Sequence, residues 1–406
     1  MNKAIESWIR EHEADMVESL CGLVRIPAIS PLDGGQGELA KAEWAEGLIE
    51  RLGLPRPERY DAIDPKARGG VRPNLIVKIP GRTPLTTWFV SHLDVVPEGD
   101  RALWETDPFE PFVKDGRVYG RGSNDNGQEL IASLYAAAAY RRLGILPETQ
   151  IGLAFVADEE LGSVFGITHL LEKGVFGKDD LVVVPDGGND KGDFIEVAEK
   201  SVLWIQFTIE GKQVHASRPD LGNNACRAAN FFSVELDEAL HKVFPETDPL
   251  FEPSCSTFEP TRRFANVANV NTIPGRETLA FDCRILPQVR LDEVESVIRD
   301  VQSKIERKTG VKIGSENVQR AEAAPVTPSD SPVVSRIRNS VRRIYGFEPK
   351  VGGVGGGTCA AHFRKMGIPA VVWAQESDTA HMPNEFAVIE HMLNEALVFA
   401  DMAGAE

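Results

Sequence analysis

The feature that most constrains the fold is a series of short, largely apolar segments that alternate with helical patterns between residues 74 and 200. The strand-like segments are "NLIVKIPG", "TTWFVSHLDVV", "QIGLAFVADEE" and "DLVVVPDGG", and "NGQELIASLYAAAAYRRLG" is helix-like. Strands that are apolar on both faces belong to a sheet that is covered on both faces. The pattern therefore predicts an α/β domain built around one central sheet.

Between residues 200 and 319 the pattern changes. "SVLWIQFTIEG" and "RETLAFDCRIL" alternate apolar and polar residues, and "FANVANVNTI" and "VKIGSENV" are predicted as further strands. Two long segments, "NNACRAANFFSVELDEALHKV" and "LDEVESVIRDVQSKIERKTG", have helical periodicity. The order β-α-β-β-α-β predicts a ferredoxin-like sandwich. Because α/β patterns return afterwards, we predict a discontinuous catalytic domain (residues 1–199 and 320–406) that carries an inserted α+β domain (residues 200–319).

The composition excludes several classes of partner. Acidic residues outnumber basic ones by 61 to 44, for a net charge of −17. The chain therefore lacks the basic surface that nucleic acid or an anionic membrane requires. The N-terminal "MNKAIESWIREHEADMVESL" has the period of one amphipathic helix and no signal-peptide core. Five scattered cysteines without a C-x-x-C pair favour neither disulfides nor a thiolate zinc site, so we expect a cytoplasmic location.

Histidines and carboxylates gather at the ends of the predicted strands or in nearby turns, where open α/β sheets place their binding sites. The candidates are His92, Asp94, Asp125, Asp158, Glu159, Glu160, Asp186 and His381. Four of them are spaced 33, 35 and 26 residues apart, about one β-α unit each: His92, Asp125, Glu160 and Asp186. Asp186 and His381 are 195 residues apart, and the inserted domain accounts for most of this separation.

These residue types favour a metal centre. Histidine and carboxylate ligands without cysteine suit zinc, for which cobalt or manganese can substitute. More than four candidate ligands indicate two ions, about 3.5–4 Å apart, that share a carboxylate and hold a water between them. One remaining carboxylate would be the general base. In the H-x-D pattern, Asp94 would accept a hydrogen bond from His92 and orient its ring. Alternation along the strand would send Asp158 to the same side as Glu160, and it receives no role.

Several longer motifs occur in order between about residue 75 and residue 390. They are "SHLDVVP", "WETDPFEPFVKDGRVYGRGSNDNG", "ADEELG", "VPDGG", "HASRPDLGNNA", "NTIPG", "FDCRILP", "GGGT" and "AHMPNE". In these motifs the chain resembles the dinuclear-zinc amidohydrolases and peptidases. That superfamily includes succinyl-diaminopimelate desuccinylase, acetylornithine deacetylase, aminoacylase, glutamate carboxypeptidase and cytosolic dipeptidases. The resemblance implies a zinc-peptidase-like catalytic domain with a central mixed sheet, and an inserted domain that acts as a lid.

The resemblance also implies a role for each site residue. One zinc would be bound by His92 and Asp186, the other by Glu160 and His381, and Asp125 would bridge both. Glu159 would activate the bridging water and later protonate the leaving amine, while Asp94 would orient its neighbouring histidine. His215 would donate to the tetrahedral oxyanion. The groups that would hold the substrate's carboxylate are Asn271, Arg284, Gly356, Gly357 and Thr358.

Some positions allow another interpretation or depart from the pattern. Arg284 could instead pair with Asp282. Many relatives have "DMKG" where this chain has "DNGQ", so the neighbours Asn126 and Gln128 differ. Cys359 occupies the position at which relatives continue the glycine loop with an acidic residue. The sequence indicates no base beside it that would make its thiol a nucleophile. A serine hydrolase is excluded because G-x-S-x-G is absent, and the glycine run does not match the dinucleotide-binding spacing.

These observations predict a zinc-dependent hydrolase that cleaves an amide bond of an N-acyl amino acid, like a desuccinylase or deacetylase. A dipeptidase or carboxypeptidase of the same superfamily is the alternative. A catalytically inactive, metal-stabilised ligand-binding relative is the rival from another class, although the retained Glu159 argues against it. The expected substrate is a small molecule or short peptide with a free carboxylate. In relatives the inserted domain often pairs its edge strands to form a homodimer, whereas other members are monomers, and the sequence leaves both states open.

Overall fold

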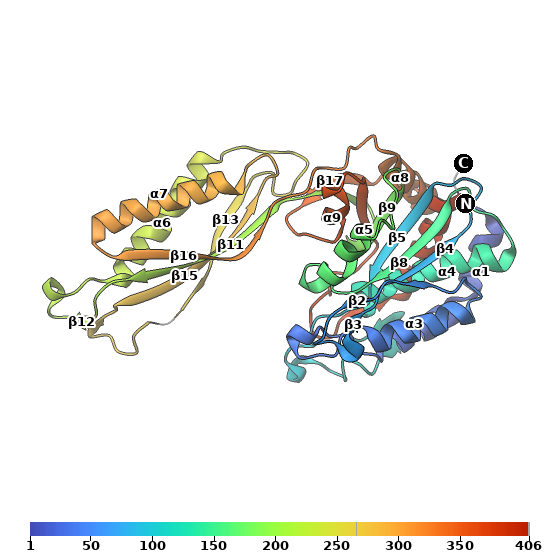
Figure 1. Ribbon diagram of the computed structural model, residues 1–406, viewed down its shortest axis with the longest axis horizontal. Helices are drawn as coiled ribbons and strands as arrows, with labels where there is room; N and C mark the ends of the chain where they lie inside the picture. Colours follow the sequence, from blue (N-terminus) through green and yellow to red (C-terminus); the bar gives the residue numbers. More distant parts are fainter. Residues whose placement is uncertain (265, 405–406) are drawn as a thin grey trace. The chain divides into compact units, whose positions relative to one another are not determined.

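The computed structural model describes residues 1–264 and 266–404, and it divides into two compact units (Figure 1). The first unit comprises Met1–Val197, Val326–Gly352 and Thr358 onward. The second comprises Ala198–Pro325 together with Gly353–Gly357. The second unit thus contains all of the predicted insertion and, in addition, most of the glycine run.

An eight-stranded mixed sheet forms the centre of the first unit. Its strands lie in the order β1 (Glu58–Arg59), β4 (Leu75–Ile79), β8 (Gln150–Val156), β5 (Thr86–His92), β9 (Leu181–Gly188), β18 (Ala370–Ala374), β10 (Phe194–Glu199) and β17 (Lys350–Val354). The inner strands β8, β5, β9 and β18 are parallel, and β4 and β10 pair antiparallel to them. Every residue of β5 is buried. This burial explains the continuous apolar runs, because these strands have no solvent-facing side.

Helices surround this sheet. They are α1 (Lys3–Glu11), α2 (Glu13–Val24), α3 (Leu39–Arg51), α4 (Gln128–Leu143), α5 (His169–Glu172), α8 (Pro332–Tyr345), α9 (Ala360–Lys365) and α10 (Ile389–Gly404). Helix α4 packs against α10, α1 and α2, and its residues 128–140 are all buried. Burial on all sides explains its apolar sequence. Among the described residues no helix combines the length and the apolar character needed to cross a membrane.

Short strands complete the first unit. The strands β6 (Phe112–Lys114), β7 (Arg117–Tyr119) and β19 (Phe386–Val388) form a three-stranded sheet, with β7 in the middle. The strands β2 (Ala62–Ile63) and β3 (Val71–Arg72) pair with each other. The pairing of β7 with β19 joins segments more than 260 residues apart in the sequence.

The second unit has a four-stranded antiparallel sheet with the order β13 (Thr257–Arg263), β15 (Arg276–Ile285), β11 (Ser201–Glu210) and β16 (Lys312–Ala321). Helices α6 (Ala225–Val243) and α7 (Leu291–Thr309) lie on one side of it (Figure 1). The apolar side chains of β11 and β15 pack there, where Phe207 contacts both Phe232 of α6 and Phe281 of β15. The topology is the β-α-β-β-α-β sandwich expected from the sequence.

Two local predictions are wrong. The predicted strand at residues 264–273 forms only as β14 (Thr272–Ile273), which pairs with β12 (Val214–His215), and residue 265 lies outside the described residues. The second strand of the sandwich is instead β13, an edge strand. Most of its side chains are exposed, so its sequence has no alternating apolar pattern. Pro260 is tolerated there because an edge strand need not donate every backbone hydrogen bond. The N-terminal helix is split at His12, where the backbone N–H donates to the carbonyl of Ile9 at 3.1 Å and the ring Nδ1 lies 2.7 Å from the carbonyl of Trp8.

Candidate metal centre

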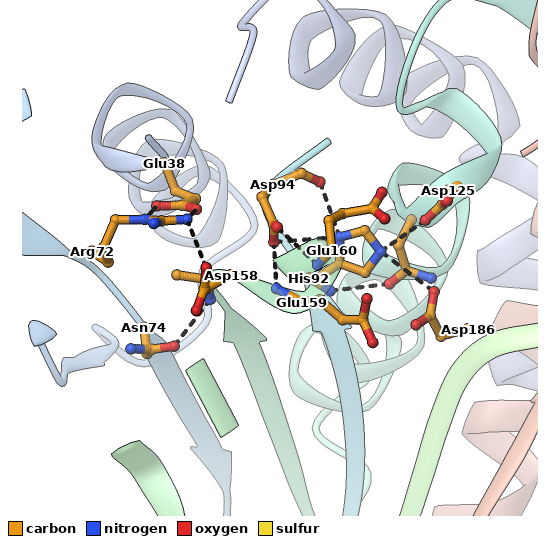
Figure 2. Close-up of polar contacts among 12 residues, drawn as sticks. Glu38, Arg72, Asn74, His92, Asp94, Asp125, Asp158, Glu159, Glu160 and Asp186 are labelled. Atoms are coloured by element: carbon orange, nitrogen blue, oxygen red, sulfur yellow. Dashed lines mark hydrogen bonds and ion pairs between the residues drawn. The ribbon is translucent and has the colours of Figure 1, made fainter. Parts of the chain in front are cut away.

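The parallel strands bring the candidate groups to one edge of the central sheet. His92 is the last residue of β5, and Asp158 to Glu160 follow directly after the neighbouring strand β8. Asp186 lies near the end of β9, on the other side of β5. Because parallel strands end at the same edge, residues far apart in the sequence meet there. Figure 2 shows the side chains grouped around the His92 ring.

Asp125 occupies the middle of the group. It lies in an irregular turn, residues 123–127, that leads into α4. Its Oδ1 is 2.8 Å from Nε2 of His92, and its Oδ2 is 3.1 Å from Nε2 of His381. One carboxylate therefore presents a different oxygen to each of two histidines.

Each histidine has a further carboxylate beside it. Nε2 of His92 is 3.3 Å from Oδ1 of Asp186, and Nε2 of His381 is 3.1 Å from Oε2 of Glu160. The arrangement has two halves, each with one histidine and one carboxylate, joined by Asp125. All five predicted ligands are thus brought together.

Glu159 lies at the same place. One of its oxygens is within 4.8 Å of ligand-type atoms of both His92 and Asp186. Geometry alone would let Glu159 bind a cation directly or hold a water beside one. The three adjacent acids of the sequence are therefore divided, because Glu159 faces the His92 half and Glu160 the His381 half.

The crowding of charge perturbs the titration of these groups. Burial alone would lower the pKa of His92, but the carboxylates of Asp186 and Asp125 raise it well above its usual value. Hydrogen bonds to Asp125 and Glu160 raise the pKa of His381 to about 10. Burial, followed by the negative charge of Asp186, raises the pKa of Glu159 well above its usual range. The site thus favours added positive charge, as a cation-binding site does.

Asp94 contacts more than the ring it was expected to orient. Nδ1 of His92 lies 2.9 Å from the backbone carbonyl of Asp94 and 3.6 Å from the carboxylate. The carboxylate accepts hydrogen bonds from the backbone N–H groups of Glu159 and Glu160, both at 3.1 Å. Asp94 therefore links the end of β5 to the loop after β8.

The expectation that Asp158 points to the same side as Glu160 is wrong. Asp158 adopts a left-handed conformation with φ 64°, which breaks the alternation of an extended strand. Its carboxylate accepts a hydrogen bond from the N–H of Phe165 at 3.1 Å and lies 3.5 Å from the guanidinium of Arg72. Arg72 is paired with Glu38, away from the His92 ring (Figure 2). Asp158 supports the loop from the side opposite the metal centre.

Several supporting residues were not found from the sequence. Oδ1 of Asn126 accepts the N–H of His92 at 3.1 Å, and its amide donates to the carbonyl of Pro185, next to Asp186. Lys41 of α3 is buried among acids that include Asp94, and burial lowers its pKa to about 8. Asn126 stood out only as a departure from the related motif, and Lys41 carried no local signal.

Two of the remaining predicted residues lie side by side in the second unit. His215 pairs with Thr272 across β12 and β14, and the backbone carbonyl of Asn271 accepts the N–H of Ala216 at 2.9 Å. His215 is exposed, and its Nδ1 accepts the N–H of Ser217 at 3.2 Å. The same Nδ1 lies 2.8 Å from Oγ of Ser217, so both contacts of the ring are made through Nδ1 and its Nε2 points to neither.

Arg284 also lies in the second unit, and its donors are engaged. Its Nε and one terminal nitrogen bond both oxygens of Asp282, at 2.7 and 3.0 Å. The other terminal nitrogen donates to the carbonyl of Gly355 at 2.8 Å. This is the pairing that had stood as the alternative to substrate contact. Gly356 and Gly357 are exposed in the same loop.

The last two residues of the glycine loop belong to the first unit. Oγ1 of Thr358 accepts the N–H of Ala360 at 3.2 Å, at the start of α9. Cys359 is buried in an apolar cluster that contains Trp88 and Phe363. Burial of this kind is typical of a structural cysteine rather than a nucleophile.

Comparison with known proteins agrees with this geometry. A family model described as Peptidase family M20/M25/M40 matches residues 88–405. An uncharacterized metallohydrolase of Methanocaldococcus jannaschii is 39% identical over 407 aligned residues, which cover 96% of this chain and 98% of that relative.

Solved structures share the fold over nearly the whole chain. A tripeptidase from Staphylococcus aureus superposes with a TM-score of 0.77 at 19% identity, covering 97% of this chain and 98% of that one. Human carnosine dipeptidase 1 gives 0.76 at 19% identity, with coverage of 98% and 97%. The predicted α/β class with a central mixed sheet is confirmed. The resemblance drawn from the motifs is confirmed as well, and the chain belongs to peptidase family M20/M25/M40, as a metal-dependent hydrolase.

Proposed function

We propose that this protein hydrolyses the amide bond of an N-acyl amino acid, such as an N-succinyl or N-acetyl amino acid, by means of a water held at a two-zinc centre. The observation that carries the proposal is the position of Asp125 between two histidines, each with a carboxylate of its own. Nitrogen and oxygen donors without sulfur suit zinc and exclude a thiolate-type site.

The donor set fits two ions with a shared ligand. His92 and Asp186 would hold one zinc, Glu160 and His381 the other, and Asp125 would bridge them. The two oxygens of Asp125 already face different histidines, at 2.8 and 3.1 Å. When bound, the two ions would supply positive charge that polarises the substrate carbonyl and lowers the pKa of a water.

Glu159 is the proposed general base and acid. His92, Asp125 and Asp186 would already serve as the ligands of one zinc. The carboxylate of Glu159 would therefore not be needed as a ligand and could hold a water beside that zinc. Glu159 would take the proton of that water as its oxygen attacks the carbonyl carbon, and would then deliver it to the amine nitrogen as the C–N bond breaks. Asp94 would fix the position of Glu159 through the backbone N–H that it accepts.

The second unit would supply groups for the transition state and for specificity. His215 is exposed, and with its Nδ1 accepting the N–H of Ser217 its Nε2 would carry a proton and donate a hydrogen bond to an oxyanion. The proposed contacts for the substrate's carboxylate are Asn271, Arg284, Gly356 and Gly357 of this unit, and Thr358 of the first unit. Arg284 would have to exchange its contacts with Asp282 for contacts with the substrate.

Hydrolysis of a dipeptide or tripeptide is the second candidate. It is favoured by the activities named for two proteins that share the fold, a tripeptidase and a dipeptidase. The two candidates differ in whether the substrate bears a free amine on the acyl side of the bond.

A substrate screen separates these candidates. The zinc-loaded protein would be tested on N-succinyl and N-acetyl amino acids and on a panel of dipeptides and tripeptides, with release of the free amine as the readout. We expect turnover of the N-acyl amino acids. Turnover of the peptides alone would replace the first candidate by the second, and no turnover by a protein that binds two zincs would favour an inactive ligand-binding relative.

A further inference from the structure

Two distant segments of the metal centre are joined by one buried side chain. Glu385 lies four residues after His381 and is fully buried. Its Oε1 accepts hydrogen bonds from the backbone N–H groups of Gly122, Asn124 and Asp125, at 3.0, 3.0 and 3.1 Å. A carboxylate on the His381 segment thus holds the backbone of the residue that lies between the two histidines.

The other contacts of Glu385 fix it in place. Its Oε2 accepts a hydrogen bond of 2.5 Å from the guanidinium of Arg121, and this ion pair is buried. Its backbone carbonyl accepts the N–H of Gly120 at 2.9 Å. Next to it, Phe386 begins β19 and pairs with Tyr119 of β7. The whole stretch of residues 119–125 is therefore attached to the segment that carries His381.

The turn at residues 122–126 needs such an anchor. Asp125 and Asn126 depart from helical dihedral angles, so the turn cannot satisfy its backbone by helical hydrogen bonds. A buried N–H without an acceptor is destabilising, and a carboxylate is a strong acceptor that can serve three of them. The position of the Asp125 side chain depends on where this backbone is held.

We propose that Glu385 is a positioning residue that sets the spacing between the two halves of the metal centre, by fixing Asp125 relative to His381. The proposal rests on the two-zinc centre proposed above. Glu385 is not among the proposed zinc ligands or substrate contacts; it would act through the backbone of Asp125. Aspartate at this position would be too short to reach both the turn and Arg121, and glutamine would turn an N–H donor toward other donors.

Zinc binding to the metal-free protein tests the proposal directly. Isothermal titration with zinc alone should give two sites in the wild type, and Glu385→Gln should weaken zinc binding by roughly 10–100-fold, as loss of an outer partner of metal ligands does. The absorption spectrum of the cobalt-loaded protein reports ligand geometry, and it should change in Glu385→Gln and in Glu385→Asp.

Glu277→Gln is the matched control. Glu277 is also buried and paired with an arginine, Arg263, at 2.9 Å, but it lies in the second unit. We expect this variant to keep the zinc affinities and the cobalt spectrum of the wild type. A general loss of stability would instead affect both variants alike, as seen in the melting temperatures of the metal-free proteins.

The outcomes separate this proposal from the proposed function. Unchanged zinc affinities and an unchanged cobalt spectrum in a folded Glu385→Gln protein would overturn the positioning role and leave the function standing. A wild type that binds no zinc would overturn the function itself. If Glu385→Gln does not fold, Arg121→Lys replaces it, since lysine keeps the charge but loses the planar guanidinium. Zinc binding by Arg121→Lys should be several-fold weaker, and wild-type affinity would contradict the proposal.

Discussion

Two groups of carboxylates lie inside the same unit, and their charges are balanced in different ways. The first group surrounds His92 and His381 at the end of the central sheet. The second consists of Glu129 on α4 and Glu395 on α10, both fully buried. In the first group, carboxylate oxygens lie within 2.8–3.3 Å of the Nε2 atoms of the two histidines, an arrangement expected where cations bind.

The second group is balanced differently. Among the described residues, no lysine, arginine or histidine forms an ion pair with Glu129 or Glu395. Nε2 of Gln128 is instead 3.0 Å from an oxygen of each acid and 3.0 Å from the carbonyl of Gln375. Three acceptors thus face an amide group with two hydrogens, and a protonated carboxyl would supply a third donor. Burial raises the pKa of Glu395 to about 8. The comparison suggests two ways of balancing buried acids in one fold: histidines and the proposed metal ions in the first group, and protons in the second.

The largest expected effect is on turnover, and it comes from Glu159, the acid of the first group that is assigned to a water and to no zinc. Glu159→Ala should lower kcat by roughly 10²–10⁴-fold, because it removes the general base and acid, while zinc remains bound. Steady-state turnover and zinc content of the same preparation check this. Full activity in a zinc-replete variant would refute the assignment of Glu159.

The bridging carboxylate should control metal binding. Asp125→Ala should weaken zinc binding by more than roughly 100-fold, because it removes a ligand from both halves. Loss of a direct ligand is expected to cost more than loss of a residue that only supports a ligand. Asp378→Ala, an exposed aspartate on the His381 segment, is the control and should retain two zincs. Two tightly bound zincs in Asp125→Ala would contradict a shared ligand.

Asp158 should matter for stability alone. Asp158→Asn keeps the size of the side chain but removes the charge opposite Arg72, so it should lower the free energy of unfolding by about 1–3 kcal/mol. Zinc content and kcat should not change. A loss of turnover at wild-type stability would show that this acid belongs to the catalytic group after all.

The second group should make stability depend on pH. Because the folded-state pKa of Glu395 is raised to about 8 from 4.5, the folded protein holds a proton that the unfolded chain releases. The free energy of unfolding should therefore fall as pH rises from about 4.5 to about 8, by up to roughly 1.4 kcal/mol per pH unit.

Substitution of Glu395 tests this dependence. Glu395→Gln should flatten the decline and make the protein more stable than the wild type near pH 8. Denaturant unfolding across this range measures the slope. The exposed Glu50→Gln serves as the control and should follow the wild type. A wild-type slope in Glu395→Gln would mean that the acid is ionised and balanced by a group other than a proton.

Much of the candidate site could be predicted, and the reason is local. His92, Glu160 and Asp186 stand at the ends of apolar strand patterns, and parallel strands bring their ends to one edge. Glu385 and Lys41 could not be found in this way. The hydrogen-bond partners of Glu385 at residues 122–125 precede it by about 260 residues, and Lys41 lies in a helix whose pattern shows only that one face is buried.

The sequence by itself determined the main alternation of strands and helices along the chain, the interruption by a second pattern of elements, and the chemical types gathered at the strand ends. These follow from side-chain periodicity and chain connectivity. Only the tertiary structure decided where Asp158 points and which contacts hold Glu159 and Glu160 in place. The left-handed backbone at Asp158 turns that side chain toward Arg72, and the carboxylate of Asp94 holds the N–H groups of Glu159 and Glu160. A one-residue change of backbone conformation and a contact across 65 residues leave no trace in a strand's pattern, because each depends on the surrounding fold.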